Sequence, residues 1–440
     1  MSAVYRVVIL VTSFGILFGF STASIAGVLD KVIRTLSMST FESEVLVTAL
    51  VAGSFIGAVI AGILSGRLGR RKTLFIAVAV AAPGFALMLF VPAYTPLIGA
   101  RLLVGLAVGL SSMVVPMYAA EATPSRHRGA VVSIFQLAVT AGIMLAYGVA
   151  FAFSDARWEL ILGSGLAIVL LCTVSIFLLP ESPRWLLAQG DSDAAARAAK
   201  DLGLLQELSL VTERPSSARG FDWSAIRRGS TVAVLVLCAA LFVLQNLSGI
   251  DGILYYAPTI FQELGFSAGS AALAATFGLG IANFLATLVA LNLVDRAGRR
   301  PLLIGGSVAM VLGLGITVAA TLLDHPWLGL AGLCIYIVSF ALSLGPLPYV
   351  LMSELFPTAI REQGIAVASA TSWLFNGLIA LTFLSLVEGA GLTGAMGLFM
   401  AVCVLSTVVA IFFVPETRAV SLETIESNVV RGKSLRWLGI

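Results

Sequence analysis

The stretch Gly66-Arg67-Leu68-Gly69-Arg70-Arg71 recurs as Asp295-Arg296-Ala297-Gly298-Arg299-Arg300 in the second half of the chain. Two more motifs repeat in the same order: Glu121-x-x-Pro124-x-x-x-Arg128 returns as Glu354-x-x-Pro357-x-x-x-Arg361, and Pro180-Glu181 returns as Pro415-Glu416. Three motifs in one order, at nearly one offset in residue number, indicate an internal duplication. Such duplication is typical of membrane transporters, in which the substrate site lies between the two repeats.

The composition agrees with a membrane protein. Of the 440 residues, 59% are hydrophobic and only 11% are charged, whereas a soluble domain usually carries about 25% charged residues. So little polar surface could not cover a chain of this length against water. An aqueous enzyme, a nucleic-acid-binding protein and a disordered chain are therefore excluded, and a polytopic membrane protein is expected.

Twelve segments are long and apolar enough to cross a bilayer, which requires about 20 residues each. They fall at 7–29, 45–66, 73–93, 97–120, 129–153 and 160–180, and at 230–262, 270–294, 301–323, 327–353, 363–387 and 391–414. The predicted fold class is an all-α membrane protein with twelve transmembrane helices in two pseudo-symmetric six-helix halves. We expect the N-terminal half at 1–180, a cytoplasmic linker with short helices at 181–229, the C-terminal half at 230–414 and a cytoplasmic tail at 415–440.

The basic residues predict the orientation. Of the 26 Lys and Arg residues, 22 lie in the termini and the even-numbered connections. Lys31, Arg34 and Arg157 fall on the other side, and Arg101 lies within a span. The positive-inside rule places both termini in the cytoplasm. We expect a multi-pass protein of the cell membrane.

Further motifs occur in a fixed order along the chain. They are Pro116-x-Tyr118-x-x-Glu121 leading to Arg128-Gly129, Pro180-Glu181-Ser182-Pro183-Arg184-Trp185-Leu186, Leu247-Ser248-Gly249-Ile250 followed by Tyr255-Tyr256-Ala257-Pro258, Gly345-Pro346 followed by Ser353-Glu354-Leu355-Phe356-Pro357, and Pro415-Glu416-Thr417-Arg418. Together with the Gly-Arg-Arg loops, this set resembles the sugar porter family of the major facilitator superfamily, from Phe14 to Glu423. The resemblance implies a secondary transporter, not an enzyme, that moves a monosaccharide or similar polyol by alternating access.

Charged residues cluster at the predicted cytoplasmic ends of the spans. The acidic members are Glu121, Glu181, Glu354 and Glu416, and the basic members are Arg70, Arg71, Arg128, Arg299, Arg300 and Arg361. They are either topology charges at the lipid headgroups or inter-helix ion pairs that close the cytoplasmic side, and the resemblance implies the second role. The family has Asp where this chain has Gly66, while the second half keeps Asp295. We therefore expect the first-half ion-pair cluster to be the weaker one.

The seventh span is unusually polar, with Gln245, Asn246, Asp251, Tyr255 and Tyr256. Amides and phenols match the hydroxyl groups of a polyol without the desolvation cost of charges. The glycines at 249 and 252 would let the helix break there, as helices do in transporters. Alternatively, these groups only form hydrogen bonds between helices. The resemblance implies a sugar site at Gln136, Gln245, Asn246, Asp251, Tyr255, Asn283, Tyr349, Trp373 and Asn376.

Proton coupling depends on three residues: Ser21, Arg101 and Asp251. In symporters of the family, an Asp on the first helix pairs with the Arg of the fourth, but here Ser21 stands in the Asp position, as a neutral residue does in facilitators. Arg101 and Asp251 are the only charges that this sequence places well inside predicted spans, and such charges are functional candidates. Asp251 follows Ser21 at nearly the offset of the repeat, so it lies near the pseudo-symmetric counterpart of the lost carboxylate. It is then a relocated coupling acid, a direct substrate ligand or a static structural partner.

Other assignments follow from what the sequence does and does not contain. The only histidines are His127 and His325, and the four cysteines are scattered singly, so we expect no metal and no cofactor. The expected partners are the lipid bilayer and a sugar or polyol, with protons in addition if transport is coupled, and no nucleic acid. We expect a functional monomer. An exporter of another small polar compound and a non-transporting sugar sensor are the alternatives.

Overall fold

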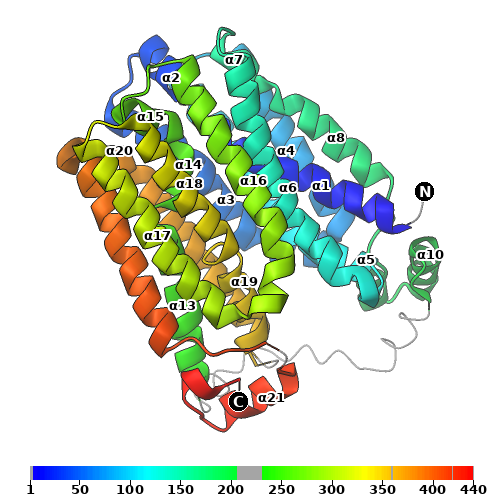
Figure 1. The fold of residues 1–440 in the computed structure, drawn as a ribbon. Helices are drawn as coiled ribbons and strands as arrows, with labels where there is room; N and C mark the ends of the chain where they lie inside the picture. Colours follow the sequence, from blue (N-terminus) through cyan, green and yellow to red (C-terminus); the bar gives the residue numbers. More distant parts are fainter. Residues whose placement is uncertain (1–2, 206–229, 358–359, 419, 440) are drawn as a thin grey trace. The chain divides into compact units, whose positions relative to one another are not determined.

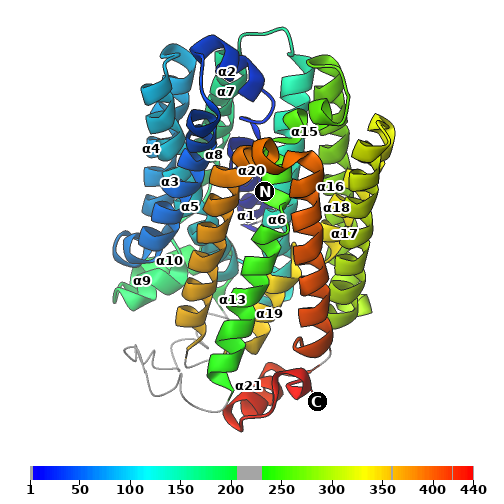
Figure 2. The ribbon, with the colours of Figure 1, turned by 90° about the vertical axis from the view of Figure 1, so that its left-hand side faces the viewer.

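The computed structural model describes residues 3–205, 230–357, 360–418 and 420–439, with the backbone alone at 125–126, 295, 361–363 and 422–423. The chain divides into two compact units, Met1–Ser217 and Ala218–Ile440, referred to below as unit 1 and unit 2. The elements assigned within the described residues are all helices. Figures 1 and 2 show the helices of each unit as a bundle.

The first helix of unit 1 coincides with most of the first predicted span. The unit contains α1 (Ala3–Ala23), α2 (Leu29–Leu36), α3 (Thr40–Leu68), α4 (Arg70–Phe90), α5 (Tyr94–Ala122), α6 (Ser125–Ala152), α7 (Trp158–Gly163), α8 (Gly165–Phe177), α9 (Pro183–Ala188) and α10 (Ser192–Leu202). The last two are short helices in the segment predicted as a linker, whose residues 206–229 lie outside the described ones.

Unit 2 has more interruptions. It contains α13 (Thr231–Leu247), α14 (Ile250–Tyr255), α15 (Ala257–Glu263), α16 (Ser270–Ala297), α17 (Arg299–Leu322), α18 (Pro326–Leu342), α19 (Leu347–Leu355), α20 (Arg361–Phe412), α21 (Leu422–Val430) and a 3₁₀ turn at Leu435–Trp437. Within this unit α21 packs against α13 and α19 (Figure 2). The backbone N–H of Ser230 donates to the carbonyl of Val429 at 2.9 Å, which ties the start of α13 to α21.

Eleven helices of the described part are long and apolar enough to cross a bilayer, and the eleventh accommodates two spans. This eleventh helix, α20, has 52 residues. At 1.5 Å per residue its length is about 78 Å, which is more than twice the thickness of the hydrocarbon core of a bilayer. Gly391 interrupts it with φ 69° and ψ 167°, a conformation that only glycine adopts readily. The predicted spans at 363–387 and 391–414 are therefore two helices joined at a glycine kink.

The seventh span is broken, as its glycines predict. Helix α13 ends at Leu247, and Gly249 takes the left-handed conformation with φ 90° before α14 begins at Ile250. A side chain at Gly249 would also collide with the ring of Phe399. A second interruption at Tyr256 separates α14 from α15. Asp251 thus lies in a short helix between two breaks.

Two pairs of helices in unit 1 pack backbone to backbone through glycine. A Cβ atom at Gly53 of α3 would collide with the carbonyl oxygen of Leu102 on α5, and one at Gly105 would collide with the carbonyl oxygen of Leu50. Gly19 of α1 packs in the same way against Val139 on α6. Small residues are the usual means of close helix approach in membranes, where lipid tails are as apolar as leucine.

We expect Gly53→Ala to destabilise the protein because its methyl group has no room against α5. Overpacking of this kind costs about 1–3 kcal/mol. Gly62→Ala is the matched control on the same helix, because nothing lies within 4 Å of a Cβ there. The melting temperature of the purified protein in detergent should fall for Gly53→Ala and stay level or rise for Gly62→Ala. Equal melting temperatures for the two variants would contradict the close contact.

Candidate functional site

Three regions contain the predicted functional residues: the charged ends of both units, the broken helix of unit 2 and the buried arginine of unit 1. In unit 1 the charged end centres on Glu121 of α5. The Nε of Arg70 donates to the Oε2 of Glu121 at 2.9 Å, and the Nη2 of Arg70 donates to the Oε1 at 2.7 Å. The hydroxyl of Ser182 donates to Oε2 at 2.6 Å. Two-point arginine–carboxylate contacts are among the stronger hydrogen bonds in proteins.

Glu181 has a different role in the same cluster. Its carboxylate accepts hydrogen bonds from the backbone N–H groups of Arg70 at 2.9 Å and Arg71 at 3.1 Å, at the N-terminus of α4. Anions are stabilised there by free N–H groups and the helix dipole. Gly69, with φ 95°, allows the approach because a side chain there would collide with this carboxylate.

Unit 2 repeats this arrangement at its own charged end. Arg299 donates to Glu354 at 2.9 Å, and the hydroxyl of Thr417 donates to the other carboxylate oxygen at 2.5 Å. Glu416 accepts from the backbone N–H groups of Arg299 at 3.1 Å and Arg300 at 3.2 Å. Gly298, with φ 92°, takes the place of Gly69. The sequence duplication is therefore also a duplication of hydrogen bonds.

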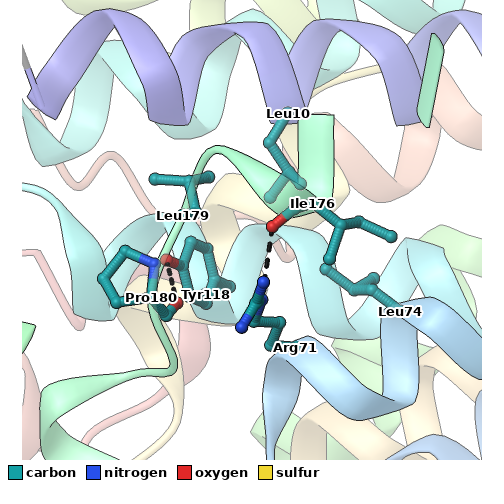
Figure 3. A pocket seen from close by; sticks show the side chains of 7 residues that line it. All are labelled: Leu10, Arg71, Leu74, Tyr118, Ile176, Leu179 and Pro180. Carbon is teal, nitrogen blue, oxygen red and sulfur yellow. Dashed lines mark hydrogen bonds between the residues drawn. The ribbon is translucent and has the colours of Figure 1, made fainter. Parts of the chain in front are cut away.

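The second arginine of each Gly-Arg-Arg motif donates to a carbonyl group at a helix end instead of to a carboxylate side chain. Arg71 donates to the carbonyl of Ile176 at 3.3 Å, beside a small cavity lined by Leu10, Leu74, Tyr118, Ile176, Leu179 and Pro180 (Figure 3). In the same view the hydroxyl of Tyr118 donates to the carbonyl of Pro180 at 2.8 Å. In unit 2, Arg300 donates to the carbonyl of Ile411 at 2.8 Å. These contacts cover the carbonyls at the ends of α8 and α20.

The predicted ion pairs thus join helices of one unit. Arg70 and Glu121 link α4 to α5, and Arg299 and Glu354 link α17 to α19. Arg128 is half-buried in α6, and the side chain of Arg361 lies outside the described part of the chain. In the described part of the chain, four of the ten predicted residues thus form ion pairs, whereas Glu181 and Glu416 bind backbone N–H groups instead. Their role as a gate, and the lower strength expected for unit 1, stay predictions.

In unit 2 the polar residues of the seventh span bind neighbouring helices. Asp251 is hydrogen-bonded to the side chain of Asn376 on α20. The Oδ1 of Asn376 accepts the hydroxyl of Tyr255 at 3.0 Å, so its NH₂ group is the one left to donate to Asp251. The hydroxyl of Tyr256 donates to the carbonyl of Ala380 at 2.8 Å. The broken helix therefore shares a polar cluster with α20.

Two amides extend this cluster along α13. The NH₂ group of Gln245 donates to the carbonyls of Leu344 at 2.8 Å and Gly345 at 2.9 Å, where α18 has ended. Asn246 donates to the hydroxyl of Ser372 on α20 at 3.2 Å. Within the described part of the chain these bonds use the NH₂ groups, and an amide oxygen can accept two further hydrogen bonds. The described geometry therefore allows these residues to bind a hydroxylated ligand as well as to join helices.

The remaining predicted sugar ligands lie on four helices. Asn283 on α16 is buried, and Trp373 on α20 is half-buried. Tyr349 on α19 is 48% exposed, with its ring edge against Phe242 at a centroid distance of 4.8 Å. Gln136 is exposed on α6 of unit 1. The structure brings together Asp251, Tyr255 and Asn376, and separately Asn246 with Ser372. Gln136 belongs to the other unit.

In unit 1, Arg101 is 1% exposed. Its guanidinium donates to the carbonyl of Ser21 on α1 at 2.8 Å and to the carbonyl of Val47 on α3 at 3.4 Å. The hydroxyl of Ser21 donates to the carbonyl of Leu17 in its own helix. Ser21 and Arg101 are therefore in contact as the resemblance implies, but through a backbone oxygen.

One buried acid was missed by the sequence analysis. Helix α3 begins at Thr40, ahead of the predicted span at 45–66, and Glu44 inside it is 1% exposed. The predicted span begins one residue after Glu44, so the sequence analysis did not count this acid among the buried charges. The missed signal is a capping box, in which Ser39 and Glu42 bond each other's backbone N–H groups.

A duplicated, glycine-kinked helical bundle with a polar cluster at a broken helix defines a secondary membrane transporter. Among the described residues, no three His, Cys, Asp or Glu side chains gather closely enough to hold a metal ion. The family model described as "Sugar (and other) transporter" matches residues 7–429. The chain belongs to this sugar porter family of the major facilitator superfamily.

Individual proteins agree with the family assignment. The galactose–proton symporter of Escherichia coli strain K12 is 35% identical over 443 residues, covering 97% of this chain and 94% of that one. The arabinose–proton symporter of the same strain is 32% identical, covering 97% and 93%. The inward open structure of the xylose transporter XylE from E. coli has a TM-score of 0.82 and 27% identity, covering 96% of this chain and 99% of that one. The predicted fold class and the exclusion of an enzyme are confirmed.

We expect Glu121→Gln to destabilise the protein, because it leaves the partly buried guanidinium of Arg70 without its counter-ion. Both side chains are 14% exposed, and a hydrogen bond to a charged group contributes about 1.5–3 kcal/mol. Glu263→Gln is the control with the same chemical change, since Glu263 is exposed at the end of α15. The melting temperature in detergent should fall clearly for Glu121→Gln only. A fall of the same size in both variants would contradict a special role for the Arg70–Glu121 pair.

Proposed function

We propose that this protein imports a monosaccharide together with protons across the cell membrane by alternating access. It works as a monomer with both termini in the cytoplasm. The positive-inside distribution of Lys and Arg supports this orientation. The sugar–proton symporters among its relatives support the substrate class and the coupling.

The observation that carries the sugar assignment is the cluster formed by Asp251, Asn376 and Tyr255. It offers a carboxylate, an amide and a phenol on two helices that meet at a helix break. These groups donate and accept hydrogen bonds in several directions, which suits a ligand with adjacent hydroxyls. Gln245 and Asn246 add two more amides on the preceding helix.

Within this cluster, we assign Asp251 to the sugar and not to the proton. A carboxylate accepts hydrogen bonds from two hydroxyl groups at once, and bonds to a charged acceptor are stronger than neutral ones. Its described partner, Asn376, is neutral and keeps the same bond whichever charge state Asp251 has. The described members of this cluster therefore include no cation that protonation of Asp251 would release.

The charged ends of the units serve as the gate in this proposal. Each unit holds its own arginine–glutamate pair, and a transporter that alternates between states needs contacts that are strong enough to bias the equilibrium and weak enough to break. Partly buried pairs meet this requirement because solvent can take over their hydrogen bonds when they open. The pairs Arg70–Glu121 and Arg299–Glu354 keep the loops that follow α3 and α16 in place for closure.

We expect the purified protein in proteoliposomes to accumulate a labelled hexose or pentose above equilibrium when the proton gradient points inward. A panel of D-galactose, D-glucose, D-xylose and L-arabinose identifies the preferred sugar. A protonophore should collapse the accumulation to the equilibrium level while uptake continues. Equilibration to one plateau with and without the gradient would overturn the proton coupling and leave a sugar facilitator.

We expect Asp251→Asn to weaken sugar binding without uncoupling the protons. Replacing a charged acceptor by a neutral one should raise the KM roughly tenfold, as expected for a loss of about 1.5 kcal/mol. At saturating sugar, accumulation should stay above equilibrium. Asp324→Asn is the matched control, because Asp324 lies in an exposed turn with φ 50°, which asparagine tolerates. Exchange intact with accumulation lost would instead make Asp251 the coupling acid.

A further inference from the structure

Glu44 is a buried acid that the sugar site does not use. It lies in the second turn of α3 and is 1% exposed. An ionised carboxylate without compensation is too costly in such surroundings, so a buried Glu is either protonated or faces a cation. The question is which cation unit 1 offers to it.

Position on α3 points to Arg101. The guanidinium reaches the carbonyl of Val47, three residues after Glu44. Residues three apart lie on the same helix face, about one turn from each other. Gly53 packs against Leu102 and Gly57 against Leu106, so α3 and α5 run in the same direction and Glu44 and Arg101 both lie in the N-terminal part of this helix pair. The backbone contact at Gly53 and Gly105 holds these helices at close range.

The other buried charges of unit 1 support this pairing. Among its described residues, the charged side chains that are less than a tenth exposed are Glu44, Arg101 and Glu159. Glu159 already has a counter-ion, because Arg157 binds it at 3.1 Å. Since a buried guanidinium also needs a negative charge nearby, Glu44 is the buried carboxylate that matches Arg101.

We propose that Glu44 is the proton-binding carboxylate of this transporter and that Arg101 is its charge partner. A proton from the outer solution binds the carboxylate and converts it to the neutral acid, and its release to the inside restores the charge. In the neutral state the attraction to Arg101 is lost, and only the guanidinium's bonds to the carbonyls of Ser21 and Val47 remain. The attraction between α3 and α5 therefore depends on the proton. The inference rests on the proposed proton symport and names its proton site.

Other titratable groups near Glu44 are already engaged or lie at a distance along the chain. On α3, Glu42 binds the backbone N–H of Ser39 at 2.8 Å, and on α5 the hydroxyl of Tyr94 donates to the carbonyl of Glu42 at 3.3 Å. On α2, Lys31 donates to the carbonyl of Ala156 at 3.0 Å, and the same helix carries Asp30 and Arg34. The remaining titratable groups of α1 and α4 lie at the N-terminal ends of those helices; they are Tyr5, Arg6, Arg70, Arg71 and Lys72.

The test compares Glu44→Gln with Glu42→Gln in proteoliposomes, using the sugar that the wild-type protein accumulates. Glu42 is the matched control because it lies two residues away on the same helix and serves to cap it. For Glu44→Gln we expect proton-driven accumulation to fall to equilibration while sugar counterflow continues. We expect Glu42→Gln to accumulate sugar like the wild type. Accumulation above equilibrium by Glu44→Gln, or equal loss of counterflow and accumulation in a folded Glu44→Gln, would overturn the proposal.

A second variant keeps the test decisive if Glu44→Gln does not fold. Glu44→Asp retains an acid but moves it by one methylene, so accumulation should persist with a shifted pH profile. An unchanged pH profile would overturn the role of Glu44. The proposed proton symport fails separately, because in that case the wild-type protein itself does not accumulate sugar above equilibrium.

Discussion

A buried guanidinium must keep its donors bonded and its charge compensated, and Arg101 imposes this requirement on unit 1. Its two described hydrogen bonds reach the carbonyls of Ser21 on α1 and Val47 on α3. Both helices must therefore approach α5 closely. The glycine contacts between α3 and α5 allow that approach, since a Cβ atom at Gly53 or Gly105 would force the helices apart. Helix packing and charge compensation thus depend on each other.

The charged ends of the two units compensate partly buried charges with side chains and helix N-termini together. Glu181 and Glu416 bind the free N–H groups at the starts of α4 and α17, so each acts as a cap for a helix. The glycine before each helix makes room for the carboxylate. Glu121 and Glu354 are then left to bind the arginine side chains. Two acids with separate tasks explain why each half of the repeat contains both.

The sequence predicts the twelve spans, the duplication and the helix break at Gly249, because hydrophobic run length, motif spacing and glycine are local signals. It does not predict that Glu181 binds backbone N–H groups, since a carboxylate near Arg70 and Arg71 suggests an ion pair unless the helix start is known. Glu44 was missed for a similar reason. A hydropathy run ends at the first charge, whereas the capping box at Ser39 sets the true start of the helix.

The two internal acids differ in what surrounds them, and this difference is the basis for their proposed roles in binding and coupling. Asp251 lies among an amide and a phenol, neutral groups that accept or donate hydrogen bonds in any state of the carboxyl group. Such surroundings favour a neutral polyol and give protonation no charged partner to release within the described cluster. Glu44 lies one helical turn from the residue whose carbonyl binds a buried cation. A change of charge there alters the attraction between helices directly. In the proposed symport, Asp251 of unit 2 binds the sugar and Glu44 of unit 1 binds the proton.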